Sequence, residues 1–212
     1  MGKSRPGLFI VFEGGEGTGK TTQIKFLQTQ LLGLGHEVVL SWEPGGTPLG
    51  ERIRAILLDP NSGPMSARCE ALLYSAARAE HVEKVLAPAL ERGAVVLCDR
   101  YWDASRAYQG VARGLGTSSI DHLNYWATDG LFPDKVFLFD IDPNIGLSRA
   151  ATRQGGMKDR LEQESIGFHE TVRRAYRFIA ESHPTSYEII NASQDIEAIK
   201  DQLWTKIQPL LH

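Results

Sequence analysis

The 212-residue sequence predicts a three-layer α/β/α protein with a five-stranded parallel sheet. Short apolar stretches alternate along the chain with stretches of helical spacing, which favours parallel strands covered by helices on both faces. No internal repeat or low-complexity linker divides the chain, and its length fits one domain over residues 1–212. Apolar residues make up 42% and charged residues 23%, the balance of a globular protein with an ample core.

The first predicted strand, residues 8–13, leads into a glycine-rich segment and then a helix at 19–34. Gly-x-x-x-x-Gly-Lys-Thr, from Gly14 to Thr21, is typical of a phosphate-binding loop (P-loop) in this strand–loop–helix context. Glycines let consecutive backbone N–H groups curl around a phosphate, and the start of the next helix attracts the same anion. The alternative is a glycine-rich turn without a ligand. The expected ATP-binding residues are Gly14, Gly15, Glu16, Gly17, Thr18, Gly19, Lys20, Thr21 and Thr22.

The helix at 19–34 has one apolar face, and Gly35 is well placed to end it. Two prolines and two glycines exclude regular structure from residues 43–48. The elements expected next are a strand at 36–42, the loop at 43–48, a short helix at 49–58 and a turn-rich break at 59–64.

A long helix is predicted over residues 66–91. One face is apolar, with Cys69, Leu72, Leu73, Ala76 and Ala79, and the roughly opposite side carries Tyr74, Arg78 and His81. Cys69 on this helix and Cys98 on a later strand are expected to be small buried residues without a disulfide, which points to a reducing cytoplasm.

The remaining elements continue the alternation of strands and helices. They are a strand at 94–99, helices at 103–111 and 118–129, a strand at 135–140, a helix at 144–153 broken by 154–156, helical spacing over Phe168, Val172, Ala175 and Ile179, a strand at 187–191, and a last helix with Ile196, Ile199, Leu203 and Ile207, which Ser193 is expected to cap.

The strand at 94–99 ends in Asp99, which places a carboxylate at the edge of the sheet where P-loop proteins bind ligands. Asp99 and the Thr21 hydroxyl are therefore candidate ligands for Mg²⁺ that accompanies a nucleoside triphosphate. A helix-capping acid is the alternative for Asp99. Arg100 would reach the same crevice, where a guanidinium bridges two phosphate oxygens.

A cluster of cations surrounds Gly155 and Gly156 late in the chain: Arg149, Arg153, Lys158 and Arg160. These charges repel one another unless an anion joins them, so the segment at about 149–161 is interpreted as a mobile lid that closes over a triphosphate and excludes water. A solvated, charged helix end is the alternative.

Spacing alone does not decide the roles of three other side chains, Arg54, Tyr74 and Arg78. Arg54 follows the loop at 43–48, where a surface role is equally plausible. Tyr74 and Arg78, four residues apart, could hold a flat base or pair with each other, and the residues alone favour the pairing.

Several classes of function are excluded. The net charge of −3 indicates no nucleic-acid-coating surface, and no apolar run approaches a membrane span. The six histidines have no ligand spacing, and there is no Gly-x-Ser-x-Gly elbow. The markers Asp-x-x-Gly and Asn-Lys-x-Asp, expected of a signalling GTPase, are missing.

Four segments taken together resemble bacterial thymidylate kinase, a family of P-loop nucleoside monophosphate kinases. They are Phe-Glu-Gly-x-Glu-Gly-x-Gly-Lys-Thr-Thr at 12–22, Glu-Pro-Gly-Gly-Thr at 43–47, Asp-Arg-Tyr-x-x-x-Ser-x-Ala-Tyr-Gln-Gly at 99–110, and Asp-Arg-Leu-Glu at 159–162. The resemblance implies a P-loop NTPase type of fold with a mobile lid. It also implies transfer of the γ-phosphoryl group of ATP to dTMP, giving dTDP on the way to dTTP.

The resemblance also implies roles for individual residues. Lys20 and Thr21 would serve the triphosphate and magnesium, and Glu16 would meet the sugar 3′-hydroxyl. Arg54 and Arg100 would hold the acceptor phosphate. The other expected substrate contacts are Tyr74 and Arg78 at thymine, Ser105 and Gln109 at the base, Tyr108 near the sugar 2′ position, and Glu43.

Some members of the family carry an arginine in the P-loop at the place of Gly17, and those without it carry cations in the lid. The resemblance therefore implies that Arg149 and Arg153 join Lys20 and Arg100 as catalytic residues. It also suggests a homodimer formed through helices such as 66–91. Another nucleoside monophosphate kinase, for example of UMP/CMP type, and a non-catalytic nucleotide-sensing P-loop module are the alternatives.

Overall fold

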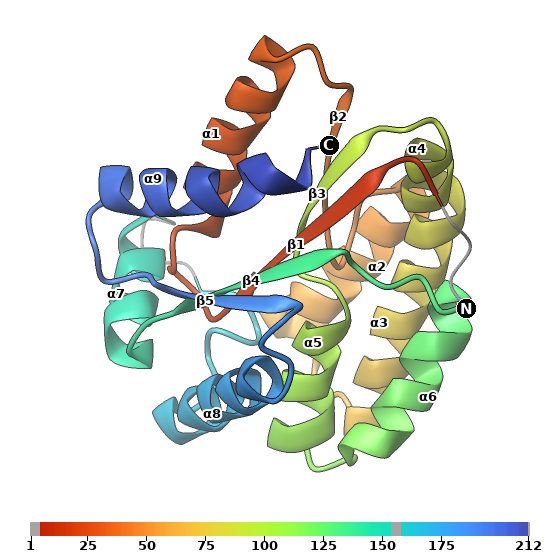
Figure 1. The fold of residues 1–212 in the computed structure, drawn as a ribbon. Helices are drawn as coiled ribbons and strands as arrows, with labels where there is room; N and C mark the ends of the chain where they lie inside the picture. The colour runs from red at the N-terminus through yellow and green to blue at the C-terminus, as the bar shows by residue number, and fades with distance from the viewer. Residues whose placement is uncertain (1–4, 154–157, 212) are drawn as a thin grey trace.

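The computed structural model of the chain describes residues 5–153 and 158–211, and only the backbone of Arg153. Five parallel strands form its central sheet in the order β2-β3-β1-β4-β5 (Figure 1). The strands are β1 Leu8–Gly14, β2 Val38–Trp42, β3 Val95–Asp99, β4 Lys135–Asp140 and β5 Tyr187–Asn191. The predicted α/β fold with a five-stranded parallel sheet is confirmed.

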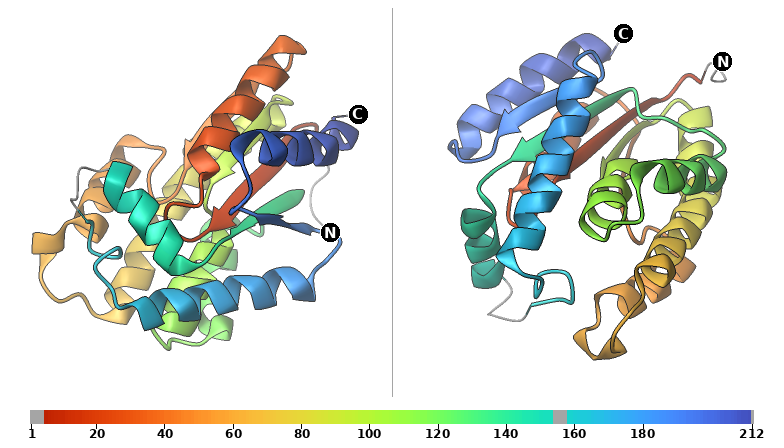
Figure 2. Two further views of the ribbon diagram at one scale, coloured as in Figure 1. Left: turned by 90° about the vertical axis from the view of Figure 1, so that its left-hand side faces the viewer. Right: turned by 90° about the horizontal axis from the view of Figure 1, so that it is seen from below.

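Helices connect the strands and lie on both sides of the sheet (Figures 1 and 2). They are α1 Lys20–Gly33, α2 Pro48–Leu58, α3 Ala67–His81, α4 Ala87–Glu91, α5 Trp102–Ser105, α6 Thr117–Thr128, α7 Pro143–Arg153, α8 Ile166–Ser182 and α9 Ile196–Ile207. Two π-helical segments, η2 Val82–Leu86 and η3 Arg106–Ala112, and two short 3-10 segments, η1 Pro60–Ser62 and η4 Gln208–Leu210, complete the described part.

The central strand β1 sends alternate side chains to two separate cores. Ile10 and Phe12 pack with apolar residues of α1 and α9 on one face of the sheet. Phe9 and Val11 pack on the other face against the helix that runs from α3 into α4. This two-sided burial explains why β1 is apolar at consecutive positions instead of alternating.

The parallel register brings the ends of several strands to one edge of the sheet. Phe12 of β1 lies opposite Asp99 of β3, and Gly14 lies opposite Phe139 of β4. The segments that follow β1, β3 and β4 therefore converge at the carboxyl edge, the place where open α/β sheets bind ligands.

The predicted helix over 66–91 is continuous, but it contains the π segment Val82–Leu86 just before Pro88. A proline inside an α-helix removes a backbone donor and clashes with the carbonyl four residues earlier. The wider π turn provides the room that Pro88 needs.

The prediction that Cys69 is buried is wrong, because Cys69 is exposed while Cys98 is buried. The apolar face of α3 lies outward, where the Leu72 side chain is 56% exposed. Arg78 and His81, on the polar side of the helix, are buried. Both find carboxylate partners inside the protein, so helical periodicity alone points to the wrong face.

Two helix ends test the predicted capping residues. Gly35 follows α1 with a φ of 86°, as expected of a glycine that ends a helix. The prediction that Ser193 caps α9 is wrong, because the Asp195 side chain accepts the capping hydrogen bond from the Ala198 N–H at 2.9 Å. Within the described ranges, no helix is both long and apolar enough to cross a membrane.

Candidate active site

The P-loop runs from Gly14 at the end of β1 to Lys20 at the start of α1. Gly17 has a φ of 63°, a conformation that side-chain-bearing residues rarely adopt. A Cβ at Gly17 would also collide with the carbonyl oxygen of Gly146 in α7. The loop therefore has no place for an arginine at this position, and any positive charge besides that of Lys20 must come from other elements.

Lys20 is buried and lies back across the loop. Its Nζ donates to the carbonyl oxygens of Gly14 and Gly15 at 3.2 and 3.0 Å and lies 3.9 Å from Asp99 Oδ1. Burial and the nearby Arg100 charge lower the pKa of Lys20. This ammonium group is surrounded by acceptors at the mouth of the loop, ready to exchange carbonyl partners for phosphate oxygens.

Thr21 and Asp99 meet at the same edge of the sheet. The Thr21 hydroxyl donates to Asp99 Oδ2 at 3.3 Å. One hydroxyl and one carboxylate are oxygen ligands of the kind that Mg²⁺ prefers. Across the described residues no group of three or more His, Cys, Asp or Glu side chains is placed to hold a metal ion. A magnesium ion here would thus take its other ligands from water and phosphate.

Arg100 joins the P-loop to the elements that follow β3. Its backbone has a φ of 72°, an uncommon conformation for a residue with a side chain. The guanidinium pairs with Glu16 at 2.5 Å and lies 5.4 Å from the centre of the Tyr108 ring. Burial would raise the pKa of Glu16, but the charges of Arg100 and Lys20 and the hydrogen bond from Tyr108 together hold that pKa below its ordinary value.

Glu13 holds the backbone that carries Arg100. This buried carboxylate accepts hydrogen bonds from the N–H groups of Tyr101 and Ala104 at 2.8 and 3.3 Å. Its second oxygen accepts from the Tyr176 hydroxyl at 2.8 Å. Burial, followed by the charge of Asp103, raises the pKa of Glu13 from 4.5 to about 7. The turn that directs Arg100 into the site thus rests on a carboxyl group that titrates near neutrality.

Glu13→Gln should flatten the dependence of stability on pH. Because the folded-state pKa is raised from 4.5 to about 7, the folded protein binds more protons than the unfolded chain in that window, and its stability falls as pH rises. Glutamine keeps the shape of the side chain and does not titrate. Between pH 5 and pH 7.5, the free energy of unfolding of the variant should therefore rise by on the order of 2 kcal/mol relative to that of the natural protein. Urea unfolding at both pH values measures this difference. Parallel pH profiles for the two proteins would contradict the assignment.

A cleft opens beside Arg100, on the side away from α7. Arg54, whose Nη1 donates to the Pro44 carbonyl oxygen at 2.9 Å, lines it together with the loop after β2. Most of the predicted substrate residues line this cleft: Glu16, Glu43, Arg54, Tyr74, Arg100, Tyr108 and Gln109.

A second hollow of about 700 Å³ lies on the other side of the P-loop, between the loop and the start of α9. Thr18 and Gly19 line it, as does Arg149 of α7. The Arg149 Nη1 donates to the Ala192 carbonyl oxygen at 3.0 Å. The P-loop therefore lies between two hollows, and Glu16 and Thr18 face different ones.

This arrangement agrees with a family comparison. The family model for thymidylate kinase matches residues 12–203. The chain belongs to the thymidylate kinase family. It is 47% identical over 209 residues to a thymidylate kinase of Desulfovibrio desulfuricans, with 96% of each chain covered. It is 49% identical over 194 residues to that of Pseudomonas putida, covering 92% of this chain and 91% of the relative.

A solved structure supports the same family. The crystal structure of thymidylate kinase from Ehrlichia chaffeensis superposes with a TM-score of 0.77 at 30% identity. The match covers 95% of this chain and 99% of that one.

Two residues that the thymidylate kinase resemblance places at the base, Arg78 and Ser105, do not line the cleft. Arg78 is buried behind it, and every N–H of its guanidinium has a partner in the protein. Its Nε donates to Glu43 at 2.7 Å, and both Nη atoms lie 3.1 Å from the Ser105 hydroxyl. The remaining two donors contact Asn124 Oδ1 and the Tyr101 carbonyl oxygen at 2.5 and 2.9 Å. Direct base contacts by Arg78 and Ser105 remain predictions, and in this structure both build the wall of the cleft.

The predicted lid cations Arg149 and Arg160, whose side chains the structure describes, bond to different partners. Residues 154–157, with Gly155 and Gly156, and the Arg153 side chain lie outside the described part, and Lys158 is exposed. Arg160 points away from the P-loop: its Nε donates to the Leu57 carbonyl oxygen at 2.7 Å, and its Nη2 lies 2.7 Å from Glu70 Oε2. In this structure Arg160 is thus occupied by partners other than an anion at the P-loop, and its part in a lid that closes over a triphosphate stays a prediction. Arg149 stays a catalytic candidate, since it borders the hollow beside the loop.

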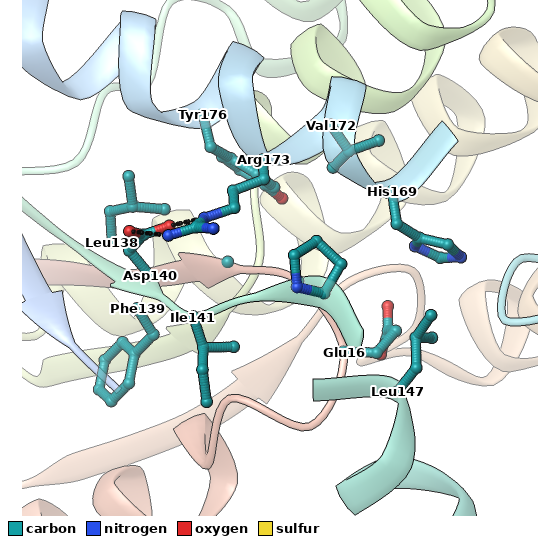
Figure 3. A pocket seen from close by; sticks show the side chains of 13 residues that line it. Glu16, Leu138, Phe139, Asp140, Ile141, Leu147, His169, Val172, Arg173 and Tyr176 are labelled. Atoms are coloured by element: carbon teal, nitrogen blue, oxygen red, sulfur yellow. Dashed lines mark hydrogen bonds and ion pairs between the residues drawn. The ribbon is translucent and has the colours of Figure 1, made fainter. Parts of the chain in front are cut away.

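Figure 3 shows a third pocket, bounded by β4, α7 and α8, that meets the P-loop at Glu16. Asp140 and Arg173 form a two-pronged ion pair at 2.6 and 2.9 Å on its wall. His169 is buried there, and burial lowers its pKa. None of these three residues was predicted to belong to a site. The signal for Asp140 was present, because it is an acid that ends a buried strand, as Asp99 does.

Proposed function

We propose that this protein transfers the γ-phosphoryl group of ATP to dTMP, producing dTDP, the precursor of dTTP. One observation carries the proposal: the P-loop separates two hollows that open on opposite sides of it. The hollow beside Thr18 and Arg149 would take the nucleoside end of ATP. The cleft beside Glu16 and Arg100 would take the acceptor, with its phosphate toward the loop. Two nucleotides then meet end to end at Lys20.

The chemistry requires placement and charge neutralisation more than covalent help from the protein. An ionised oxygen of the acceptor phosphate attacks the γ-phosphorus directly, so no general base is needed. Lys20 and Arg100 stabilise the charge on the equatorial oxygens. Arg149 and Arg153 supply further positive charge from α7. Arg54 holds the acceptor phosphate, and Tyr108 closes the sugar site near the 2′ position.

The hydroxyl of Thr21 and the carboxylate of Asp99 would hold a magnesium ion at the mouth of the loop. When bound, Mg²⁺ neutralises charge on the β- and γ-phosphate oxygens. Lys20 and the loop amides position the same phosphates.

An acceptor panel tests the function directly. Initial rates of ADP formation are measured with dTMP, dUMP, UMP, CMP and AMP, and repeated with EDTA to test the magnesium requirement. We expect dTMP to give the highest kcat/KM. A preference for UMP or CMP would identify a different monophosphate kinase, and no stimulation by any monophosphate would indicate a nucleotide sensor.

We also infer that the protein forms a homodimer through the outer side of α3 and α6, which pack against each other (Figure 1). The Leu72 side chain on α3 is 56% exposed, and Trp126 on α6 is 86% exposed. Burying such apolar surface favours association, at about 25 cal/mol per Å². Charged groups at these positions should therefore oppose the dimer.

Leu72→Glu combined with Trp126→Glu should convert the dimer to a monomer in sedimentation velocity experiments. Phe178→Glu is the matched control, because Phe178 on α8 is exposed to a similar degree, 73%, on another side of the fold. A natural protein that sediments as a monomer, or a double variant that stays dimeric, would contradict this surface.

We place the protein in the cytoplasm. Both cysteines, Cys69 and Cys98, are free thiols, as expected in a reducing compartment. Its substrates would be ATP and dTMP, with no nucleic acid or membrane partner. Cell fractionation tests this location.

A further inference from the structure

Glu70 of α3 is completely buried and has several cationic and polar neighbours. Its Oε1 accepts hydrogen bonds from Gln109 Nε2 at 2.7 Å and from Arg113 Nε at 3.3 Å. Its Oε2 accepts from Arg113 Nη2 at 3.2 Å. Arg160 Nη2 also lies 2.7 Å from Oε2; this is an ion pair by distance, although its angles are not those of a hydrogen bond. One carboxylate thus joins three segments that are distant in the sequence.

Glu70 fixes which end of the Gln109 amide points toward it. Burial would favour the neutral acid, but hydrogen bonds from Gln109 and Arg113 hold the pKa of Glu70 below its ordinary value. An ionised carboxylate only accepts hydrogen bonds. The NH₂ group of Gln109 must therefore face Glu70, and the carbonyl oxygen must be the end that points elsewhere.

The free end of that amide belongs to the acceptor cleft, which Gln109 lines together with Tyr74. Among the described residues, the Gln109 carbonyl oxygen has no hydrogen-bond donor. The cations Arg100 and Arg54 lie elsewhere along the same cleft, and Arg100 is bonded to the P-loop through Glu16. With the acceptor phosphate at Arg100, the base reaches the wall formed by Tyr74 and Gln109.

We propose that Glu70 is a positioning residue that sets the base selectivity of the acceptor site by holding Gln109 with its carbonyl oxygen toward the base. This proposal rests on the proposed function. A buried acceptor recognises a ring with an imino N–H, such as thymine or uracil. Cytosine presents a ring nitrogen with a lone pair at the same position, so two acceptors would face each other without a proton.

Glu70→Gln should reverse the Gln109 amide. Arg113 and Arg160 are donors only, so the new amide at position 70 turns its oxygen toward them and its NH₂ group toward Gln109. Gln109 then accepts with its oxygen and presents NH₂ to the base. We expect kcat/KM for dTMP to fall and that for dCMP to rise, so that their ratio decreases by at least about tenfold.

Arg113→Met is the matched control, because it removes another partner of Glu70 but leaves the Glu70–Gln109 hydrogen bond. It should lower the thermal midpoint and keep the dTMP/dCMP ratio within about twofold. If Glu70→Gln folds and keeps the natural ratio, or if Arg113→Met shifts the ratio equally, Glu70 does not set selectivity. If Glu70→Gln does not fold, the dTMP/dCMP ratio of Glu70→Asp decides, since the shorter carboxylate breaks the contact with Gln109 and must then weaken selectivity. A natural protein without dTMP kinase activity would instead refute the proposed function.

Discussion

Lys20→Ala is expected to lower kcat with ATP and dTMP by at least about 100-fold, the scale of losing one preorganised electrostatic donor. The buried Nζ lies within 3.2 Å of two loop carbonyl oxygens and 3.9 Å from Asp99. It is the only full positive charge that the P-loop itself contributes, since the segment from Gly14 to Thr22 has no other basic residue. Steady-state kinetics at saturating ATP and dTMP measure the loss.

Lys25→Ala is the matched control for this variant. Lys25 lies on the same helix α1 but is exposed, so its removal should change kcat by less than about twofold and leave the thermal midpoint in place. Because the Lys20 ammonium also donates hydrogen bonds to the loop carbonyl oxygens, circular dichroism must show that Lys20→Ala is folded. Turnover within threefold of the natural protein in a folded Lys20→Ala sample would remove Lys20 from the mechanism.

The sequence was sufficient for the fold because strand, loop and helix signals here are local. The apolar run before Gly14 and the apolar run that ends in Asp99 each predict a buried strand, and both strands are found. The order of the strands in the sheet could not be predicted in the same way, because the placement of β1 between β3 and β4 depends on contacts between distant segments. The structure adds the direct contact between the Thr21 hydroxyl and Asp99 that the predicted magnesium site requires.

The candidate site could be predicted where a residue lies in a motif, and not where its role depends on burial. Arg100 and Tyr108 follow from the Asp-Arg-Tyr segment and line the cleft as expected. Arg78 and Glu70 could not be interpreted in the same way. Both are buried polar residues on a helix whose most apolar face, with Leu72, lies outward. A helical pattern does not reveal that their partners, such as Glu43, come from other elements. Glu70 was not a candidate at all.

Arg100→Met should lower kcat/KM for dTMP by about 100- to 1000-fold, the range seen when one donor at a developing charge is removed. The Arg100 guanidinium pairs with Glu16 at 2.5 Å and lies 5.4 Å from the centre of the Tyr108 ring, so it borders the loop and the acceptor cleft together. Methionine keeps a Cβ at the φ of 72°, so the backbone cost is the same in both proteins, as it would not be with glycine. The comparison thus isolates the guanidinium.

The matched control is Arg106→Met, at a position six residues further along the chain. Arg106 also pairs with carboxylates, Asp121 and Asp103, at 2.5 and 3.1 Å, and lies 5.6 Å from the Trp102 ring, but it lines neither nucleotide hollow. Losing it should reduce stability while kcat/KM for dTMP changes less than about threefold. Arg100→Lys should fall between the natural protein and Arg100→Met, because an ammonium keeps the charge but cannot bridge two oxygens. If Arg100→Met and Arg106→Met lower kcat/KM for dTMP equally, Arg100 acts through folding. A residue that binds the acceptor phosphate should instead lower kcat/KM far more than its effect on stability explains.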